Sequence, residues 1–143
     1  MKFQYRKVAL PKSDAFPERH FALRPVIPVF FKIPDGDRRI GYEALVDSGA
    51  DYNIFPAQVA EIIGLDVNDG RLDIYGGVGG GKFEAYFHKV KIYIGGWEHS
   101  VDCAFSYDFA PWGYGILGQK GFFDLFVVKF DLLKEEIELK ERK

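Results

Sequence analysis

One short segment of this chain combines residue types that can do chemistry: the apolar run Ala44-Leu45-Val46 leads directly into Asp47, Ser48, Gly49 and Ala50. The run predicts a strand that carries the carboxylate into a tight turn. Two carboxylates that share one proton can hydrolyse an amide, because the ionised one accepts a proton from water and the protonated one donates to the carbonyl oxygen. Since the tetrapeptide occurs once, this chemistry needs two copies of the chain at one site.

The residues around Asp47 suit this role. The apolar neighbours Leu45 and Val46 help to remove water from the carboxylate. Ser48 can hydrogen-bond across the turn, and Gly49 allows a close backbone turn and leaves its N–H free to reach the carboxylate. At about 3 Å and an effective dielectric constant near 20, two like charges repel by roughly 5 kcal/mol. The pair therefore does not ionise fully near neutral pH, and its two pKa values belong to both carboxylates together.

Two further segments can complete such a site. Glycines fill the stretch from Gly76 to Lys82, with the β-formers Tyr75 and Phe83 on either side. This pattern predicts a hairpin that bends, as a lid over a cleft must in order to open, close and exclude water. The second segment, Ile116-Leu117-Gly118, precedes a predicted short helix at residues 122–126 and is expected to support the Asp47 turn from beneath.

In this order, the three segments resemble those of the retropepsins, the retroviral-type aspartic peptidases. Asp47 to Asp51 matches the family's Asp-Thr/Ser-Gly-Ala-Asp signature, Gly76 to Gly81 looks like its glycine-rich flap, and Ile116 to Gly118 looks like its hydrophobic-hydrophobic-Gly motif. The resemblance covers roughly residues 26 to 130. It implies an all-β, closed-barrel-like fold with one or two short helices. It also implies a homodimer with aspartic endopeptidase activity on polypeptides and no metal or cofactor.

The resemblance also implies roles for single residues. Asp47 would be the catalytic residue of each protomer, Ser48 would join the network that links the two catalytic turns, and Gly49 would offer its carbonyl to the substrate backbone. Asp51 would contact the substrate main chain, although an Asp near a helix start can instead cap backbone N–H groups. The other substrate-binding residues that the resemblance implies are Ala50, Tyr75, Gly76, Gly77, Val78, Gly79, Trp112, Tyr114 and Ile116. For Trp112, a partly buried loop anchor is the competing interpretation.

The chain departs from the viral members of the family in three places. Its N-terminal segment is longer than a minimal retropepsin needs, and a predicted C-terminal hairpin continues past the predicted helix. Gln119 follows the Ile-Leu-Gly motif where many viral members carry Arg, which predicts that an ion pair is missing there. These departures affect the expected dimer interface more than the expected active site.

Composition and local patterns favour one β-rich domain. The 143 residues are 48% apolar and include 14 Phe, 8 Tyr and 16 Gly, which suits strands joined by tight turns. Residues 1–25 mix charges with three prolines and show no sustained period, so we predict an N-terminal arm, loosely ordered or packed across a partner. Residues 26–143 form the predicted peptidase domain. Within it we expect a helix at 56–64 and strands at 26–33, 40–46, 72–75, 83–94, 101–107, 127–130 and 137–140.

Charge and cysteine content exclude several classes of function. The net charge of −2 gives no electrostatic basis for binding nucleic acid. No apolar run approaches the roughly 18 residues of a membrane span, and the first residues lack the apolar stretch of a signal peptide. The single cysteine, Cys103, cannot form an internal disulfide, so a cytoplasmic location is expected. Its apolar neighbours indicate a core residue rather than a nucleophile.

Other interpretations remain open at this point. The segment from Gly76 to Lys82 nearly fits the phosphate-loop pattern, but Phe83 stands where Ser or Thr is needed for magnesium. The three histidines show no metal-ligand spacing, so no metal site is predicted. A barrel of this kind can also serve as a binding module that holds a peptide or partner without turnover. A third possibility is a latent dyad that becomes active only when residues 1–25 move.

Overall fold

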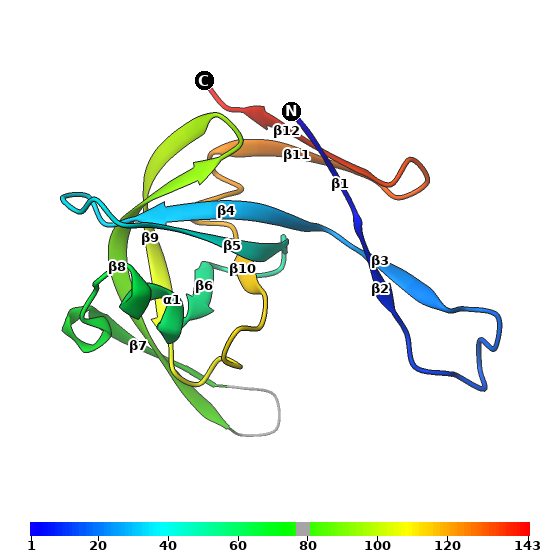
Figure 1. Ribbon diagram of the computed structural model, residues 1–143, viewed down its shortest axis with the longest axis horizontal. Helices are drawn as coiled ribbons and strands as arrows, with labels where there is room; N and C mark the ends of the chain where they lie inside the picture. The colour runs from blue at the N-terminus through cyan, green and yellow to red at the C-terminus, as the bar shows by residue number, and fades with distance from the viewer. Residues whose placement is uncertain (77–80) are drawn as a thin grey trace.

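The computed structural model describes residues 1–76 and 81–143 and consists almost entirely of strands (Figure 1). Within these ranges the helical elements are one α-helix, α1 (Ala57–Ile62), and one turn of 3-10 helix, η1 (Val67–Asp69). The strands, in chain order, are β1 (Lys2–Gln4), β2 (Arg6–Ala9), β3 (Phe21–Arg24), β4 (Val26–Lys32), β5 (Arg39–Val46), β6 (Asn53–Pro56), β7 (Arg71–Gly76), β8 (Lys82–Ile94), β9 (Trp97–Ser106), β10 (Gly115–Leu117), β11 (Phe126–Asp131) and β12 (Glu136–Glu141). None of the described helices is long and apolar enough to cross a membrane.

A closed barrel forms the centre of the molecule. Its strands follow one another in the order β4-β5-β10-β6-β9-β8, and β8 pairs back to β4 to close the ring. Strand β10 is parallel to β5 and antiparallel to β6, while β6 is parallel to β9. Strand β7 extends the sheet beyond the ring by pairing with β8. Closure protects the barrel strands from pairing with other chains. The all-β, closed-barrel prediction is confirmed.

The barrel interior is filled by side chains that alternate along the strands. In β4, Ile27, Val29 and Phe31 are completely buried, as expected when every second residue faces inward. The ring of Phe31 meets that of Phe55 edge to face, with 4.5 Å between their centroids, and Phe105 lies 6.4 Å from both. Burial of each such aromatic ring contributes about 1.5–3 kcal/mol to folding, before entropy is subtracted. This core gives the strands that carry the site a rigid base.

The predicted helix at 56–64 is confirmed in a slightly shorter form. Helix α1 begins after Pro56 and buries Val59 and Ala60 against the barrel. Gly64 lies just beyond its end with φ of +92°, a left-handed conformation that glycine adopts without steric cost. Its N–H donates to the carbonyl of Glu61 at 3.0 Å. The glycine therefore stops the helix where the sequence indicated.

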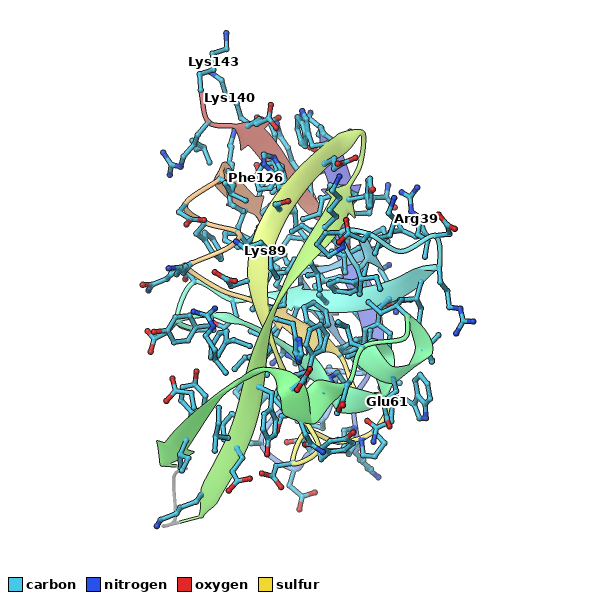
Figure 2. The ribbon with its side chains drawn as sticks, turned by 90° about the vertical axis from the view of Figure 1, so that its left-hand side faces the viewer. Arg39, Glu61, Lys89, Phe126, Lys140 and Lys143 are labelled. Atoms are coloured by element: carbon cyan, nitrogen blue, oxygen red, sulfur yellow. The ribbon has the colours of Figure 1, made fainter. Side chains whose placement is uncertain are left out.

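A second, three-stranded sheet lies beside the barrel, with its strands in the order β1-β12-β11. Phe126 joins it to the barrel, because its ring packs 5.2 Å from that of Trp97 and 5.3 Å from that of His99 (Figure 2). The helix predicted at 122–126 is wrong: these residues form consecutive turns before β11 begins at Phe126. The N–H groups of Phe123 and Asp124 donate to the carbonyls of Gly118 and Gln119, five residues earlier. These hydrogen bonds tie the segment to the residues that precede it instead of forming a helix.

Residues 1–25 contain three short strands, which the sequence did not indicate. Strand β1 pairs with β12, whereas β2 and β3 pair only with each other. The two form a hairpin that projects from the barrel (Figure 1). We call residues 6–24 the arm hairpin. Each of its strands has four residues, which is too short for the alternating pattern to stand out from the charged and proline-rich loop between them.

Candidate active site

The predicted catalytic turn lies where two parallel strands end side by side. In the register of β5 with β10, Leu45 pairs with Ile116 and Val46 with Leu117. The N–H of Asp47 donates to the carbonyl of Leu117 at 3.0 Å. The Ile-Leu-Gly segment therefore supports the Asp47 turn directly, which confirms that structural prediction. It does so from within the sheet, as a strand inserted between β5 and β6.

Backbone groups fix the carboxylate of Asp47. The N–H of Gly49 donates to Asp47 Oδ1 at 2.9 Å, and the N–H of Ala50 donates to the Asp47 carbonyl at 3.1 Å. The first contact confirms the predicted use of the free glycine N–H. Asp47 is half-buried, whereas Ser48 and Gly49 are exposed. The carboxylate is therefore held by the backbone of its own turn, and the turn is exposed at Ser48 and Gly49.

Asn53 supports the turn from the core and was missed by the sequence analysis. Its side chain is completely buried. Its Oδ1 accepts the N–H of Gly118 at 2.9 Å, and its Nδ2 donates to Cys103 Sγ at 3.7 Å. A buried amide of this kind is stable only when its polar atoms have partners. A polar residue inside the apolar stretch around Ile54 and Phe55 was the signal that could have identified it.

Gln119 was expected to mark a missing ion pair, but the structure gives it two contacts with the turn. Its backbone N–H donates to the carbonyl of Ala50 at 2.8 Å, and its side-chain Nε2 donates to the carbonyl of Ser48 at 2.9 Å. The next residue, Lys120, donates its N–H to the carbonyl of Asp51 at 2.9 Å. The turn is thus held along its length by the segment that follows β10.

The helix-cap interpretation of Asp51 is wrong. The helix begins at Ala57, six residues later, with Pro56 at the cap position and no side-chain hydrogen bond there. Asp51 is exposed beside the catalytic turn. A contact between its carboxylate and a substrate main chain remains a prediction.

An apolar pocket of about 400 Å³ adjoins the turn. Its lining comes from β5, from β10 and from the loop between β9 and β10, namely Leu45, Asp108, Phe109, Ala110, Gly113, Tyr114, Gly115 and Ile116. Of the three residues predicted to line side-chain pockets, the structure brings Tyr114 and Ile116 together here. The polar part of this lining is small, which suits an apolar side chain.

Trp112 lies on a neighbouring pocket of about 410 Å³, which it lines together with Arg6, Tyr42 and Glu43. Its side chain is 61% exposed, so it covers little of the barrel surface. Its φ of 62° is unusual for a bulky residue. Arg6 forms an ion pair with Glu43 and lies 5.9 Å from the ring centroid of Tyr114. The first residue of the arm hairpin therefore lies between the two pockets.

A row of aromatic rings connects the β7–β8 hairpin to the residues beside the turn. Tyr75 stacks on Phe83 at 5.0 Å between centroids and lies 6.4 Å from Tyr52. Phe83 in turn lies 6.3 Å from Phe109 in the apolar pocket. Burial, reinforced by the charge of Asp73, raises the pKa of Tyr75 above its ordinary value. The tyrosine therefore stays neutral and acts through packing.

The predicted hairpin around the glycines is confirmed for the strands that flank them. Strand β7 pairs with β8 from Arg71 to Gly76, and Gly76 lies opposite Lys82. Gly77, Val78 and Gly79, which the resemblance implies as substrate-binding residues, lie outside the described residues. Their contacts with a substrate remain predictions.

Cys103 is a core residue, as predicted. Its side chain is completely buried, and burial raises the pKa of its thiol to about 12. Because the thiolate is the reactive form, we expect no measurable reaction of native protein with a thiol reagent such as DTNB at pH 8. Full reaction is expected after unfolding in guanidinium chloride. Rapid reaction of the native protein, followed by absorbance, would show that the thiol is accessible.

Two of the histidines have partners within the protein. His88 Nε2 lies 2.8 Å from the carbonyl oxygen of Val67, and His99 Nε2 lies 2.8 Å from Glu141 Oε2. Over residues 1–76 and 81–143, no group of three or more His, Cys, Asp or Glu side chains is placed to hold a metal ion.

Comparison with known proteins identifies the family and the fold that the chain resembles. Residues 32–120, more than half of the chain, match the sequence profile of a family described as aspartyl protease. Among solved structures, the fold is similar to that of the EIAV protease in complex with the inhibitor HBY-793, with a TM-score of 0.50 and 23% sequence identity. That match covers 67% of this chain and 82% of the EIAV protease chain. No curated protein matches the sequence.

Proposed function

Because the chain belongs to the aspartyl protease family, we propose that it is an aspartic endopeptidase whose active site forms between two copies of the chain. The observation that carries the proposal is the fixed carboxylate of Asp47. It is held by the N–H of Gly49 and by the strand that ends at Leu117, next to an apolar pocket. The sequence contains one such turn, so the second carboxylate comes from a second chain.

The proposed reaction uses the two Asp47 side chains as an acid and a base. At about 3 Å they repel by roughly 5 kcal/mol if both are ionised, so one proton is shared between them. The ionised carboxylate accepts a proton from water, and the protonated one donates to the oxygen of the scissile carbonyl. Water then attacks the carbonyl carbon without an acyl-enzyme.

The substrate is an extended polypeptide that lies between the turn and the β7–β8 hairpin and pairs with backbone groups as an added strand does. In this arrangement Ser48 links the two turns, and the Gly49 carbonyl and Asp51 contact the substrate main chain. Tyr114 and Ile116 bind side chains in the apolar pocket. The other proposed contacts are Ala50, Tyr75, Gly76, Gly77, Val78, Gly79 and Trp112.

The apolar pocket predicts the preferred substrates. Peptides with Leu or Phe next to the cut are expected to be cleaved at least tenfold faster, as kcat/KM, than peptides with Ser or Asn there, since burial of a large apolar side chain contributes about 1.5–3 kcal/mol. The measurement is mass spectrometry of a mixed peptide library incubated between about pH 4 and pH 7, the range in which a shared proton is expected. The protein concentration is kept high to favour dimers.

Equal cleavage of apolar and polar peptides would contradict the role of the pocket without affecting that of Asp47. Peptide binding without cleavage, by a verified dimer, would contradict the proposed activity. That result would favour the binding module instead.

A further inference from the structure

The arm hairpin is attached beside the proposed active site. It ends at Pro25, whose carbonyl accepts the N–H of Val46 at 2.8 Å, so its base lies one residue from Asp47 along β5. At its other end, Arg6 pairs with Glu43 on the same strand. Figure 1 shows the hairpin projecting from the end of the barrel at which β4 begins and β5 ends. The arm therefore starts at the face that carries Asp47.

The surface of the arm hairpin is apolar and basic. Phe16 is 62% exposed and Phe21 is 47% exposed. The hairpin carries five Lys or Arg residues and two Asp or Glu residues, while the whole chain has a net charge of −2. The rest of the chain is therefore acidic, with a net charge of −5. An isolated two-stranded hairpin is only marginally stable in water, so a surface that packs against this one stabilises it.

We propose that the arm hairpin docks on a second copy of this chain and clasps it beside the shared active site. The inference rests on the proposed two-chain site. Two carboxylates about 3 Å apart place the two-fold axis within a few ångströms of Asp47. Strand β2 alone spans about 13 Å at ~3.3 Å per residue, and the loop extends further. An arm of this length that starts beside the axis is long enough to reach the partner.

The charge of the arm hairpin favours a second copy of the chain, rather than a substrate, as the surface on which it docks. The arm is positive, and the body of each copy is negative, so a symmetric pair places each arm against a surface of opposite sign. In the symmetric pair the contact occurs twice, because each chain contributes one arm and one body.

Cross-linking between labelled and unlabelled chains tests the contact directly. Equal amounts of ¹⁴N and ¹⁵N protein are mixed to form mixed dimers and treated with a carbodiimide, which joins lysine amines to carboxylates in direct contact. We expect cross-linked peptide pairs in which Lys7 or Lys12 carries one label and the carboxylate carries the other. Single-label pairs also form, in dimers that contain one isotope; the absence of mixed-label pairs at Lys7 and Lys12 would overturn the proposal.

A matched pair of variants measures the contribution of the arm. Phe16→Ser/Arg19→Glu alters the arm tip, and Ile62→Ser/Lys89→Glu makes similar changes on exposed positions of the barrel. By sedimentation, we expect the tip variant to raise the dimer dissociation constant at least tenfold, and the control variant to change it by less than twofold. Circular dichroism confirms that both variants are folded.

The outcomes separate the two proposals. A wild-type dimer with the same dissociation constant in both variants would overturn the docking of the arm and leave the proposed peptidase untouched. If the tip variant instead raises KM for long polypeptides without weakening the dimer, the arm binds substrate and the docking proposal is wrong. A wild type that remains monomeric at every concentration would contradict the two-chain active site itself.

Discussion

Asp47→Asn is expected to reduce kcat/KM for a cleavable peptide by at least about 10³-fold while leaving the fold intact. An amide can neither accept a proton from water nor donate one to the scissile carbonyl as a carboxylic acid does. The substitution removes both groups of the proposed pair, because each copy of the chain supplies one. Asn keeps the shape of the side chain and an oxygen that accepts the N–H of Gly49, so the turn should persist.

The measurement is kcat/KM for one peptide from the library, with dimer content checked by sedimentation. Asp66→Asn is the matched control, because it makes the same chemical change at an exposed residue after α1. Loss of activity in the first variant alone is the expected result. Cleavage that survives Asp47→Asn in a purified, verified sample would show that another group activates the water.

Gly118→Ala is expected to lower the free energy of unfolding by about 3 kcal/mol and to reduce activity sharply. A Cβ at this position would lie 2.4 Å from the carbonyl oxygen of Tyr52 and 2.8 Å from that of Ala50. Both obstacles are backbone atoms, so relief requires the catalytic turn itself to move. Insertion of a methyl group into a well-packed site typically costs about 1–3 kcal/mol. At Gly118 the nearest atoms belong to the backbone, so no flexible side chain can move aside to make room.

Urea unfolding gives the stability change, and Gly96→Ala serves as the matched control. A Cβ at Gly96 would meet no atom within 4 Å, and its φ is not positive, so this variant should unfold near the wild-type midpoint. If Gly118→Ala were as stable and as active as wild type, the close approach of β10 to the catalytic turn would not matter for function.

Most of the barrel could be predicted from the sequence because its strands are strongly patterned. The apolar run of β4 and the turn residues Pro34–Asp37 after it indicated the first strand pair, and Gly64 indicated the end of α1. The predictions failed where the local sequence pattern did not match the structure that forms. Phe122 and Phe126 have helical spacing, but hydrogen bonds back to Gly118 and Gln119 and the start of β11 leave no room for a helix. The arm strands were too short to show a period.

The chemistry of the site was easier to predict than its support. Asp47 and Gly49 are adjacent in sequence, so their contact follows from a local turn. Asn53 and Gln119 reach the turn only because β10 lies between β5 and β6, and this arrangement is not visible along the chain. Trp112 was grouped with Tyr114 and Ile116 through the family resemblance; Tyr114 lines both pockets, whereas Trp112 lines one of them and Ile116 the other.

The position of β10 also has a consequence for the order of events during synthesis. Strand β10 (Gly115–Leu117) must insert between two strands that leave the ribosome much earlier. Contacts this distant in sequence form slowly, because a long loop has to close first. A nascent chain that ends before residue 115 contains Asp47 but lacks the carbonyl of Leu117 and the amide of Gly118 that shape its turn. The catalytic geometry is therefore among the last features to appear as the chain is made.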